Sequence, residues 1–317
     1  MSVEIWDAIR YERPLLQGRT KPLVLECEQR NASAGADVPT LVPSPSVSPV
    51  SSLLLGASGR PLGKAPSLIL PNQEDEEEEA SNAQSRLFVV KGLGHPEVLE
   101  ETLFKELFGN VLARAFGIET PAPALVVLSE ALVRTVQPLL PPEIKLRVGY
   151  AVGCEYLNPL TPIGAEFRLT RALLPEAAQI YAFDLLTANP DRHIRNPNCA
   201  YRSDRLVAYD FESAFSFLRA LWGPPAWQVS KLTFQHPHVF KAQLLRDGAD
   251  WQPFVNCLEG LDEAKLGAIV KDWPHAWLSH YPRVVDYILA ARDELQRWPL
   301  ELEESLRVAS DGAGNRR

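Results

Sequence analysis

Short apolar runs separated by polar or glycine-containing segments recur through the first half of the chain, a pattern typical of β-strands joined by turns. Two of these runs, residues 12–16 and 23–27, flank the polar segment 17–22 and predict a hairpin. Later apolar runs predict strands, at 86–91 and 123–128, and an apolar stretch at 148–157 that Gly153 interrupts. We therefore expect the amino-terminal half to be rich in β-structure.

Longer segments repeat apolar residues every three or four positions, which predicts helices. The first covers about 96–116, and the second begins at Pro175 and ends before Pro190. Beyond residue 218 two further patterns predict helices, Phe254-Leu258-Leu261 and Val284-Ile288-Ala291-Leu295. Strands followed by helices predict an α+β fold.

The residues from about 29 to 85 have a different composition. Residues 38–49 are rich in proline and serine, and residues 74–79 are all acidic. Such a segment buries too little apolar surface to offset its ordering entropy, so we expect a disordered insertion between two strands. Residues 56–64 superficially resemble a phosphate loop, but no strand precedes them and no Ser or Thr follows Lys64. We interpret them as linker.

Charge and cysteine content narrow the class of protein. The net charge of −8 falls to −2 without the six acidic residues at 74–79, so a broad basic face for nucleic acid is not expected. The cysteines are scattered without a CxxC pair, which favours free thiols in a reducing compartment (Cys27, Cys154, Cys199 and Cys257). The sequence shows neither an apolar signal core nor a membrane span, and a cytoplasmic location is expected.

The most informative chemistry lies at residues 191–196, where the sequence is Asp-Arg-His-Ile-Arg-Asn. Asp191 and Asn196 have the spacing that protein kinases use between the acid that accepts the substrate proton and the amide that holds a metal. Asp210 follows the apolar run 205–209, where kinases place a second metal ligand. Each residue alone fits a turn or cap, but the joint spacing predicts a phosphoryl-transfer site.

Other residues fit the nucleotide side of such a site. Lys91 ends an apolar run, as does the kinase lysine that contacts nucleotide phosphates. A glycine turn at Gly18 can let backbone N–H groups approach a phosphate. By position, Glu155 and Leu157 lie in a hinge whose backbone would meet the adenine. The glutamate that pairs with Lys91 stays open among Glu100, Glu101 and Glu106, since periodicity puts Glu100 nearest the middle of the apolar arc.

These motifs together resemble the HipA-like kinases, particularly stand-alone bacterial members. The resemblance covers most of residues 10–300 apart from the insertion, and its parts are 13–14, 18–22, 88–91, 105–106, 112–118, 183–184, 189–198, 209–215 and 238–240. It implies a two-lobed protein-kinase-like fold, with a β-rich N-lobe at 1–153 and a helical C-lobe at 154–317. The Asp-Arg-His-x-x-Asn motif is also shared with phosphoinositide kinases.

Position by position, the resemblance implies Asp191 as catalytic base and Asn196 with Asp210 as Mg²⁺ ligands. It implies that Lys91 contacts ATP, that the turn with Gly18 and Thr20 lies by the phosphates, and that Glu106 is the helix glutamate. Phe211-Glu212 stands where common protein kinases have Phe-Gly, so a glycine-hinged activation segment is not expected.

The function expected is therefore ATP- and Mg²⁺-dependent transfer of phosphate to a Ser or Thr hydroxyl of a protein, with the insertion as a candidate site of autophosphorylation. One alternative is a nucleotide-binding or interaction module without catalysis. Another is a lipid or small-molecule kinase, although no basic membrane-facing stripe is present. The protein substrate, a regulatory partner and the oligomeric state stay open.

Overall fold

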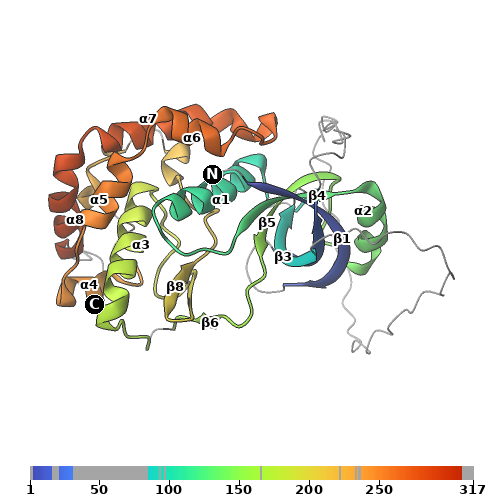
Figure 1. Ribbon diagram of the computed structural model, residues 1–317, viewed down its shortest axis with the longest axis horizontal. Coiled ribbons are helices and arrows are strands. Elements are labelled where there is room, and N and C mark those ends of the chain that lie inside the picture. The colour runs from blue at the N-terminus through green and yellow to red at the C-terminus, as the bar shows by residue number, and fades with distance from the viewer. Residues whose placement is uncertain are drawn as a thin grey trace, which may run out of the picture.

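A computed structural model describes residues 3–15, 21–30, 85–92, 94–95, 98–164, 166–220, 223–232, 234 and 237–308. Strands from the amino-terminal half form a closed barrel in the order β1-β2-β3-β5-β4 (Figure 1). They are β1 (Glu4–Pro14), β2 (Leu23–Gln29), β3 (Ser85–Gly92), β4 (Pro123–Leu128) and β5 (Gly149–Glu155). The predicted strands at 86–91 and 123–128 are confirmed, as is strand structure within 148–157.

The first strand begins earlier than expected, because the sequence predicts strand structure only from residue 12 onward. In the structure β1 starts at Glu4 and pairs in parallel with β4, which closes the barrel. Trp6 and Ala8 alternate with more exposed neighbours and fill the barrel core. The alternation is hard to find in the sequence because register shifts interrupt the pairing of β1 with β2.

The insertion joins two neighbouring strands. β2 and β3 pair antiparallel, with Leu23 opposite Val90 and Glu28 opposite Ser85. Residues 31–84, including the Pro/Ser-rich and acidic parts, lie outside the described residues. A long segment between adjacent antiparallel strands adds only a slowly growing closure entropy, so the barrel is compatible with it.

The helix α1 (Glu100–Ala115) lies between the barrel and the helical part of the molecule (Figure 1). Its residues from Thr102 to Ala113 are all buried, so it packs on every side rather than along one stripe. The same apolar cluster contains residues of α1, of β4 and β5, and of the carboxy-terminal helices. A periodic stripe is therefore a poor guide to which face of α1 meets the barrel.

The helical part is built around α3 (Leu174–Leu186), which is almost wholly buried. A small sheet, β6-β7-β8, lies beside it and consists of Thr161–Pro162, Cys199–Arg202 and Arg205–Ala208. Further helices follow along the chain: α2 (Glu130–Val136), which covers the barrel, then α4 (Lys241–Asp247), α5 (Gln252–Glu259), α6 (Glu263–Ile269), α7 (Tyr281–Arg292) and α8 (Trp298–Arg307). Short 3-10 turns are η1 (Gln137–Leu139), η2 (Arg171–Leu173), η3 (Ser216–Arg219), η4 (Val229–Lys231), η6 (His275–His280) and η7 (Leu295–Arg297).

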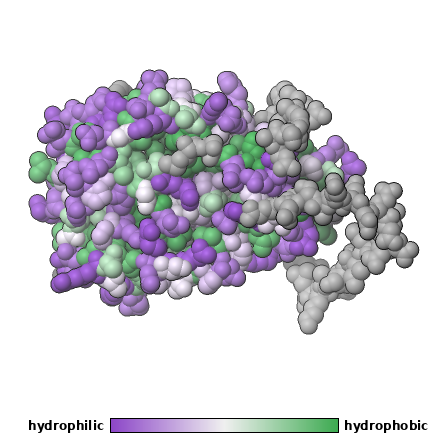
Figure 2. All heavy atoms as spheres, viewed as in Figure 1, coloured by the Kyte–Doolittle hydropathy of each residue, from purple (hydrophilic) through white to green (hydrophobic). Residues whose placement is uncertain are grey.

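The sequence also predicts tryptophans packed in the core or in a groove and free cysteine thiols, and the described residues agree with both. Tryptophans 251, 273, 277 and 298 are buried in the helical core, and Trp227 packs against its edge, whereas Trp222 lies outside the described residues. All four cysteines are free thiols. No helix in the described part of the chain is both long and apolar enough to span a bilayer. Hydrophilic residues predominate on the face seen in Figure 2, with smaller hydrophobic patches among them.

Candidate active site

A cavity of about 350 Å³ lies between the barrel and the helical part. Five of the residues singled out in the sequence line it: Lys91, Glu106, Glu155, Leu157 and Asp210. The other lining residues are mainly apolar and come from both parts of the chain, among them Leu15, Val89, Val152, Leu160, Ala200 and Tyr209. A concave, mostly apolar space of this size with a few charged groups is typical of small-molecule sites.

The segment from Glu155 to Leu157, predicted as a hinge, forms one wall of this cavity. The backbone N–H of Glu155 donates to the Ala122 carbonyl at 2.9 Å, and that of Tyr156 donates to the Leu87 carbonyl at 2.7 Å. Both donors are therefore used to hold the segment against the barrel. The N–H of Leu157 meets no backbone acceptor within the described part of the chain, which leaves it for a ligand in the cavity.

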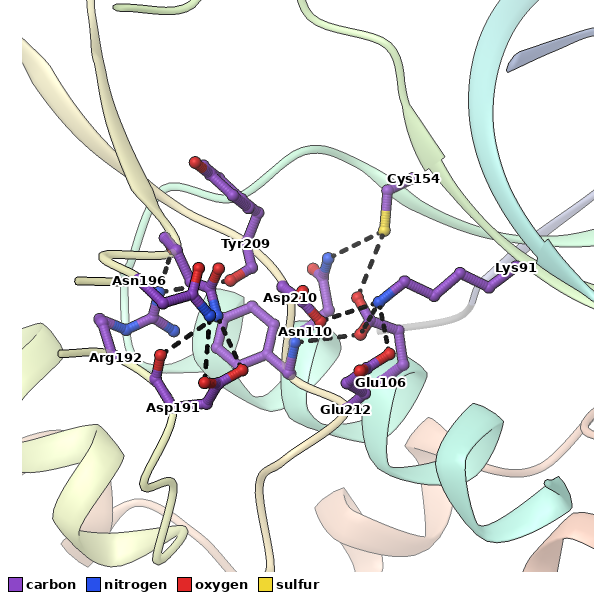
Figure 3. A network of polar contacts seen from close by, with 12 residues as sticks. Lys91, Glu106, Asn110, Cys154, Asp191, Arg192, Asn196, Tyr209, Asp210 and Glu212 are labelled. Atoms are coloured by element: carbon purple, nitrogen blue, oxygen red, sulfur yellow. Dashed lines mark hydrogen bonds and ion pairs between the residues drawn. The ribbon is translucent and has the colours of Figure 1, made fainter. Parts of the chain in front are cut away.

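Lys91 lies at the charged end of the cavity, at the end of β3. Its ammonium is 3.0 Å from Glu106 Oε2, 2.8 Å from Asp210 Oδ1 and 3.0 Å from Glu212 Oε2 (Figure 3). Glu106 comes from α1, whereas Asp210 and Glu212 follow β8. Since opposite charges a hydrogen bond apart hold buried groups ionised, the ammonium fixes three carboxylates that would otherwise repel one another.

The pKa values in this cluster reflect burial working against charge. Burial would lower the pKa of Lys91, but the three carboxylates together raise it well above its ordinary value, so the amine is an ammonium at physiological pH. Burial raises the pKa of Glu106 to about 7, against the opposing pull of Lys91. Burial also acts to raise the pKa of Asp210, but the ion pair with Lys91 outweighs it and the pKa is lowered.

Backbone geometry joins Asp210 and its neighbours to α1. Asp210 has a left-handed φ of 61°, and the next N–H, that of Phe211, donates to Glu106 Oε2 at 3.0 Å. Gly109 lies one turn further along α1, and a Cβ at this position would be 2.7 Å from the Phe211 Cβ. The glycine thus allows the segment after β8 to approach α1 closely enough for Glu106 to reach Lys91.

Asp191 lies in a loop held by asparagines. The Asn196 amide donates to Asp191 Oδ1 at 3.0 Å, and the Asn198 amide donates to Asp191 Oδ2 at 3.2 Å and to its carbonyl at 3.3 Å. The Asp191 N–H donates to Asn189 Oδ1 at 3.2 Å. Because both carboxylate oxygens accept bonds, the orientation of Asp191 is fixed before any substrate arrives.

A buried network of ion pairs and hydrogen bonds around Asp184 supports the loop that carries Asp191. Arg192 Nε lies 2.6 Å from Asp184 Oδ2, and both side chains are fully buried. His238 Nε2 lies 3.1 Å from the same oxygen, and Asn189 Nδ2 donates to Asp184 Oδ1 at 2.9 Å. Burial acts to raise the pKa of Asp184, but Arg192 and His238 reverse this and lower it. The loop is therefore held to α3 by charge and not only by packing.

Arg192 connects the Asp191 loop to the segment that carries Asp210. Its Nη1 donates to the carbonyls of Asn198 and Tyr209, the latter at 3.3 Å, and its guanidinium lies over the Phe211 ring at 5.2 Å. In the view of Figure 3 the Asp191 group lies on one side of Asp210 and the Lys91 group on the other. Neither Asp191 nor Asn196 lines the cavity, so they form a separate group beside it.

The helix glutamate is settled geometrically, because Lys91 pairs with Glu106 and not with Glu100, which periodicity favoured. The stripe argument fails since α1 is buried on all sides. Gly18 and Thr20 lie outside the described residues, so their predicted phosphate contacts stay predictions. The roles of the other site residues also stay predictions at this point.

Sequence reasoning overlooked three polar contacts. It noted Glu212 only as a departure from Phe-Gly, although a carboxylate inside the apolar run 211–215 is an unusual feature that needs a partner. It assigned no role to Asn198, whose only signal is its nearness to Asn196. The run His236-Pro237-His238 predicts surface or packing histidines and not a metal pair; His238 is indeed buried, but its bond to Asp184 was not anticipated.

The residues present fit Mg²⁺ and a nucleotide. Mg²⁺ takes oxygen ligands, and Asp210 offers a carboxylate that is 31% exposed and lines the cavity. Asn196 uses its amide nitrogen on Asp191, so its amide oxygen is the atom that could accept a cation. One oxygen each from Glu106, Asp210 and Glu212 also lie within 4.8 Å of one another, but the Lys91 ammonium already bridges these three groups.

Comparisons with known proteins give a family match and a similar solved structure. A family model described as HipA-like kinase matches residues 80–299, which is more than half of the chain. No curated protein matches. Among solved structures, the chain is similar to the crystal structure of a Helicobacter pylori proinflammatory kinase, CtkA, with 11% identity, a TM-score of 0.36, and coverage of 71% of this chain and 89% of that chain. The chain belongs to the HipA-like kinase family.

Proposed function

We propose that this protein is an ATP- and Mg²⁺-dependent kinase that transfers the γ-phosphate to a Ser or Thr hydroxyl of a protein. The proposal includes a two-lobed arrangement, with residues 1–153 and 154–317 on either side of the nucleotide. The observation that carries it is a single cavity with the hinge residues Glu155 and Leu157 along one wall and Lys91 and Asp210 at its charged end. ATP has a matching shape, because the largely apolar faces of adenine lie at one end of the molecule and the anionic phosphates lie at the other.

The nucleotide is held along the length of the cavity. The unused N–H of Leu157 donates to the adenine edge, and Val89, Val152 and Leu160 cover its faces. Lys91 donates to the phosphates, and Glu106 sets the direction of its ammonium. We also propose that Gly18 and Thr20, which lie outside the described residues, contribute to binding the phosphates.

Asp210, which lines the cavity, and Asn196, which lies beside it, would hold the metal. Mg²⁺, when bound, offsets the charge of the phosphates and so favours attack on the γ-phosphate. Asp210 reaches this position from the end of β8, where its left-handed backbone turns the side chain toward Lys91 and the cavity. Arg192 holds the backbone at Asn198 and at Tyr209, because its Nη1 donates to both carbonyls.

Asp191 acts on the acceptor. Its carboxylate orients the substrate hydroxyl and takes up the proton as the oxygen attacks. The bonds from Asn196 and Asn198 keep the carboxylate in one orientation, which reduces the entropy lost on reaching the transition state. Its place beside the cavity, and not in its lining, leaves room for a protein acceptor to approach from outside.

Labelled ATP with Mg²⁺ tests the proposal. The full chain is expected to transfer label to Ser or Thr residues of itself or of proteins in a cell lysate. Asp191→Asn should lower the rate by about 10²–10⁴-fold while ATP binding is retained. Asp286→Asn, on the exposed side of α7, is the control and should leave the rate unchanged.

The alternative of a module without catalysis predicts another outcome. ATP would then raise the melting temperature, but no label would be transferred and Asp191→Asn would change no reaction. Label found only on added lipid or on a small molecule would favour a different acceptor class. Absence of ATP binding with and without Mg²⁺ would overturn the proposal altogether.

A further inference from the structure

The ammonium of Lys91 has no hydrogen left for a phosphate. A lysine ammonium carries three N–H donors. Three carboxylate oxygens lie within 3.0 Å of Lys91 Nζ, one each from Glu106, Asp210 and Glu212. If Lys91 contacts a nucleotide phosphate, as the proposed function requires, one of these three ion pairs must open first.

Asp210 is the partner best placed to leave. Its side chain is 31% exposed and lines the cavity, whereas the side chains of Glu106 and Glu212 are 3% and 8% exposed. Glu106 is also held by the Phe211 N–H. Asp210 would gain a metal ion in exchange for the ammonium, whereas a buried glutamate that left Lys91 would give up a cation at hydrogen-bond distance.

Glu212 therefore has a distinct place in the cluster. It lies two residues beyond Asp210 on the same segment, but it is buried and does not line the cavity. The buried Lys105 of α1 is a second cation in its neighbourhood, and Lys105 is itself paired with Glu101 at 3.5 Å. Glu212 is thus fixed between two elements that do not need to move when Asp210 turns.

We propose that Glu212 is a positioning residue that, together with Glu106, keeps the Lys91 ammonium in place when Asp210 turns to the metal and a phosphate takes the third N–H. This inference rests on the proposed function and extends it. Glu212 also adds a negative charge to the cluster at the phosphate end of the cavity, beside Glu106 and Asp210. ATP without metal is repelled by that charge, so Glu212 makes ATP binding more dependent on Mg²⁺.

Calorimetric titration of the full chain with ATP tests this directly, in Mg²⁺ and in excess EDTA. The readout is the dissociation constant for ATP in EDTA divided by the dissociation constant in Mg²⁺. This ratio is measured for the wild type, for Glu212→Gln and for Glu166→Gln. Glu166, whose side chain is 97% exposed, serves as the matched control. The ratio should fall about fivefold or more in Glu212→Gln, because metal-free ATP binds more tightly, and should not change in Glu166→Gln.

The outcomes separate the two proposals. A wild type that binds ATP under neither condition overturns the proposed function itself. A wild type that binds MgATP, with a Glu212→Gln variant of the same Mg²⁺ dependence, overturns only the inference about Glu212. A purely structural role would lower the melting temperature and leave the ratio unchanged.

A second variant covers the case in which Glu212→Gln does not fold. Glu212→Asp keeps the charge but shortens the side chain by one carbon. We expect MgATP to bind as in the wild type and kcat to fall about tenfold, because the ammonium is no longer held in the direction of the transferring phosphate. An unchanged kcat in folded Glu212→Asp would contradict the positioning role.

Discussion

Arg192 Nε and Asp184 Oδ2 lie 2.6 Å apart with both side chains fully removed from solvent, directly beneath the loop that carries Asp191. The pair joins α3 to the residue next to the proposed catalytic base. Because His238 and Asn189 bond to the same carboxylate, Asp184 is the point at which three segments of the helical part meet: α3, the loop with Asn189 and Arg192, and the segment with His238.

Removal of one partner of this pair should be costly. Asp184→Ala leaves the Arg192 charge buried without its counter-ion, and a loss of about 3–5 kcal/mol in the free energy of unfolding is expected. Denaturant titration measures it. The exposed pair Glu130–Arg134 supplies the control, and Glu130→Gln should cost less than about 0.5 kcal/mol. Equal losses in the two variants would show that the buried network carries no special weight.

The same network predicts that stability falls in acid. Burial lowers the pKa of His238 below its ordinary 6.5 despite the pull of Asp184, and the pKa of Asp184 lies below its ordinary 3.8. The unfolded chain therefore binds protons more readily than the folded chain, first at His238 as pH falls through 6.5 and then at Asp184 below 3.8. The stabilisation that neutral His238 and ionised Asp184 contribute is therefore present above these two pH values and is lost below them.

Denaturant titrations between about pH 7.5 and about pH 5 check the His238 part of this expectation, where each proton contributes a slope of up to about 1.4 kcal/mol per pH unit. His238→Gln keeps a polar group but does not titrate, so its slope should be smaller than that of the wild type. If His238→Gln showed the same slope of unfolding free energy against pH as the wild type, titratable groups other than His238 would account for the loss of stability in acid.

Asn198 should affect the rate more than nucleotide binding. Asn198→Ala removes the amide that donates to Asp191 Oδ2, so the base loses part of its fixed orientation. A fall of about tenfold in kcat with little change in the KM for ATP is expected, since Asn198 does not line the cavity. Steady-state kinetics with labelled ATP measure both constants. A rise in KM alone would point to a role in the nucleotide site instead.

Gly109 and Gly267 should respond in opposite ways to alanine. In an exposed helix, alanine is favoured over glycine by up to about 1 kcal/mol. At Gly267 the nearest atom to an added Cβ is 3.7 Å away, so Gly267→Ala should stabilise the protein slightly. At Gly109 the Phe211 Cβ would be 2.7 Å away, so Gly109→Ala should cost about 1–3 kcal/mol by overpacking.

Thermal or denaturant unfolding of both variants gives the comparison. Gly109→Ala should also weaken ATP binding, because the displacement of Phe211 moves its N–H away from Glu106 and disturbs the partner of Lys91. If Gly109→Ala proved as stable as the wild type with unchanged ATP affinity, the close approach of α1 and the Asp210 segment would have no part in shaping the site.

Features that depend on neighbouring residues could be predicted from the amino-acid order. The apolar run at 123–128 forms a strand with the predicted bounds, because strand formation follows local burial and turn residues. Asp191 and Asn196 contact each other because their separation lies within one loop. The positions of Lys91 and Asp210 at strand ends could likewise be found, since both follow apolar runs.

Contacts between distant residues were decided by the folded chain. Glu106 and the Phe211 N–H are 105 positions apart, and Lys91 and Glu212 are 121 apart, so no local period connects them. Because α1 is packed on all sides, periodicity could not select Glu106 over Glu100. The parallel pairing of β1 with β4 closes the barrel, and the alternation of buried residues along β1 is obscured in the sequence by register shifts. The order of residues thus indicates the chemistry available, and long-range packing determines which charges meet at Lys91.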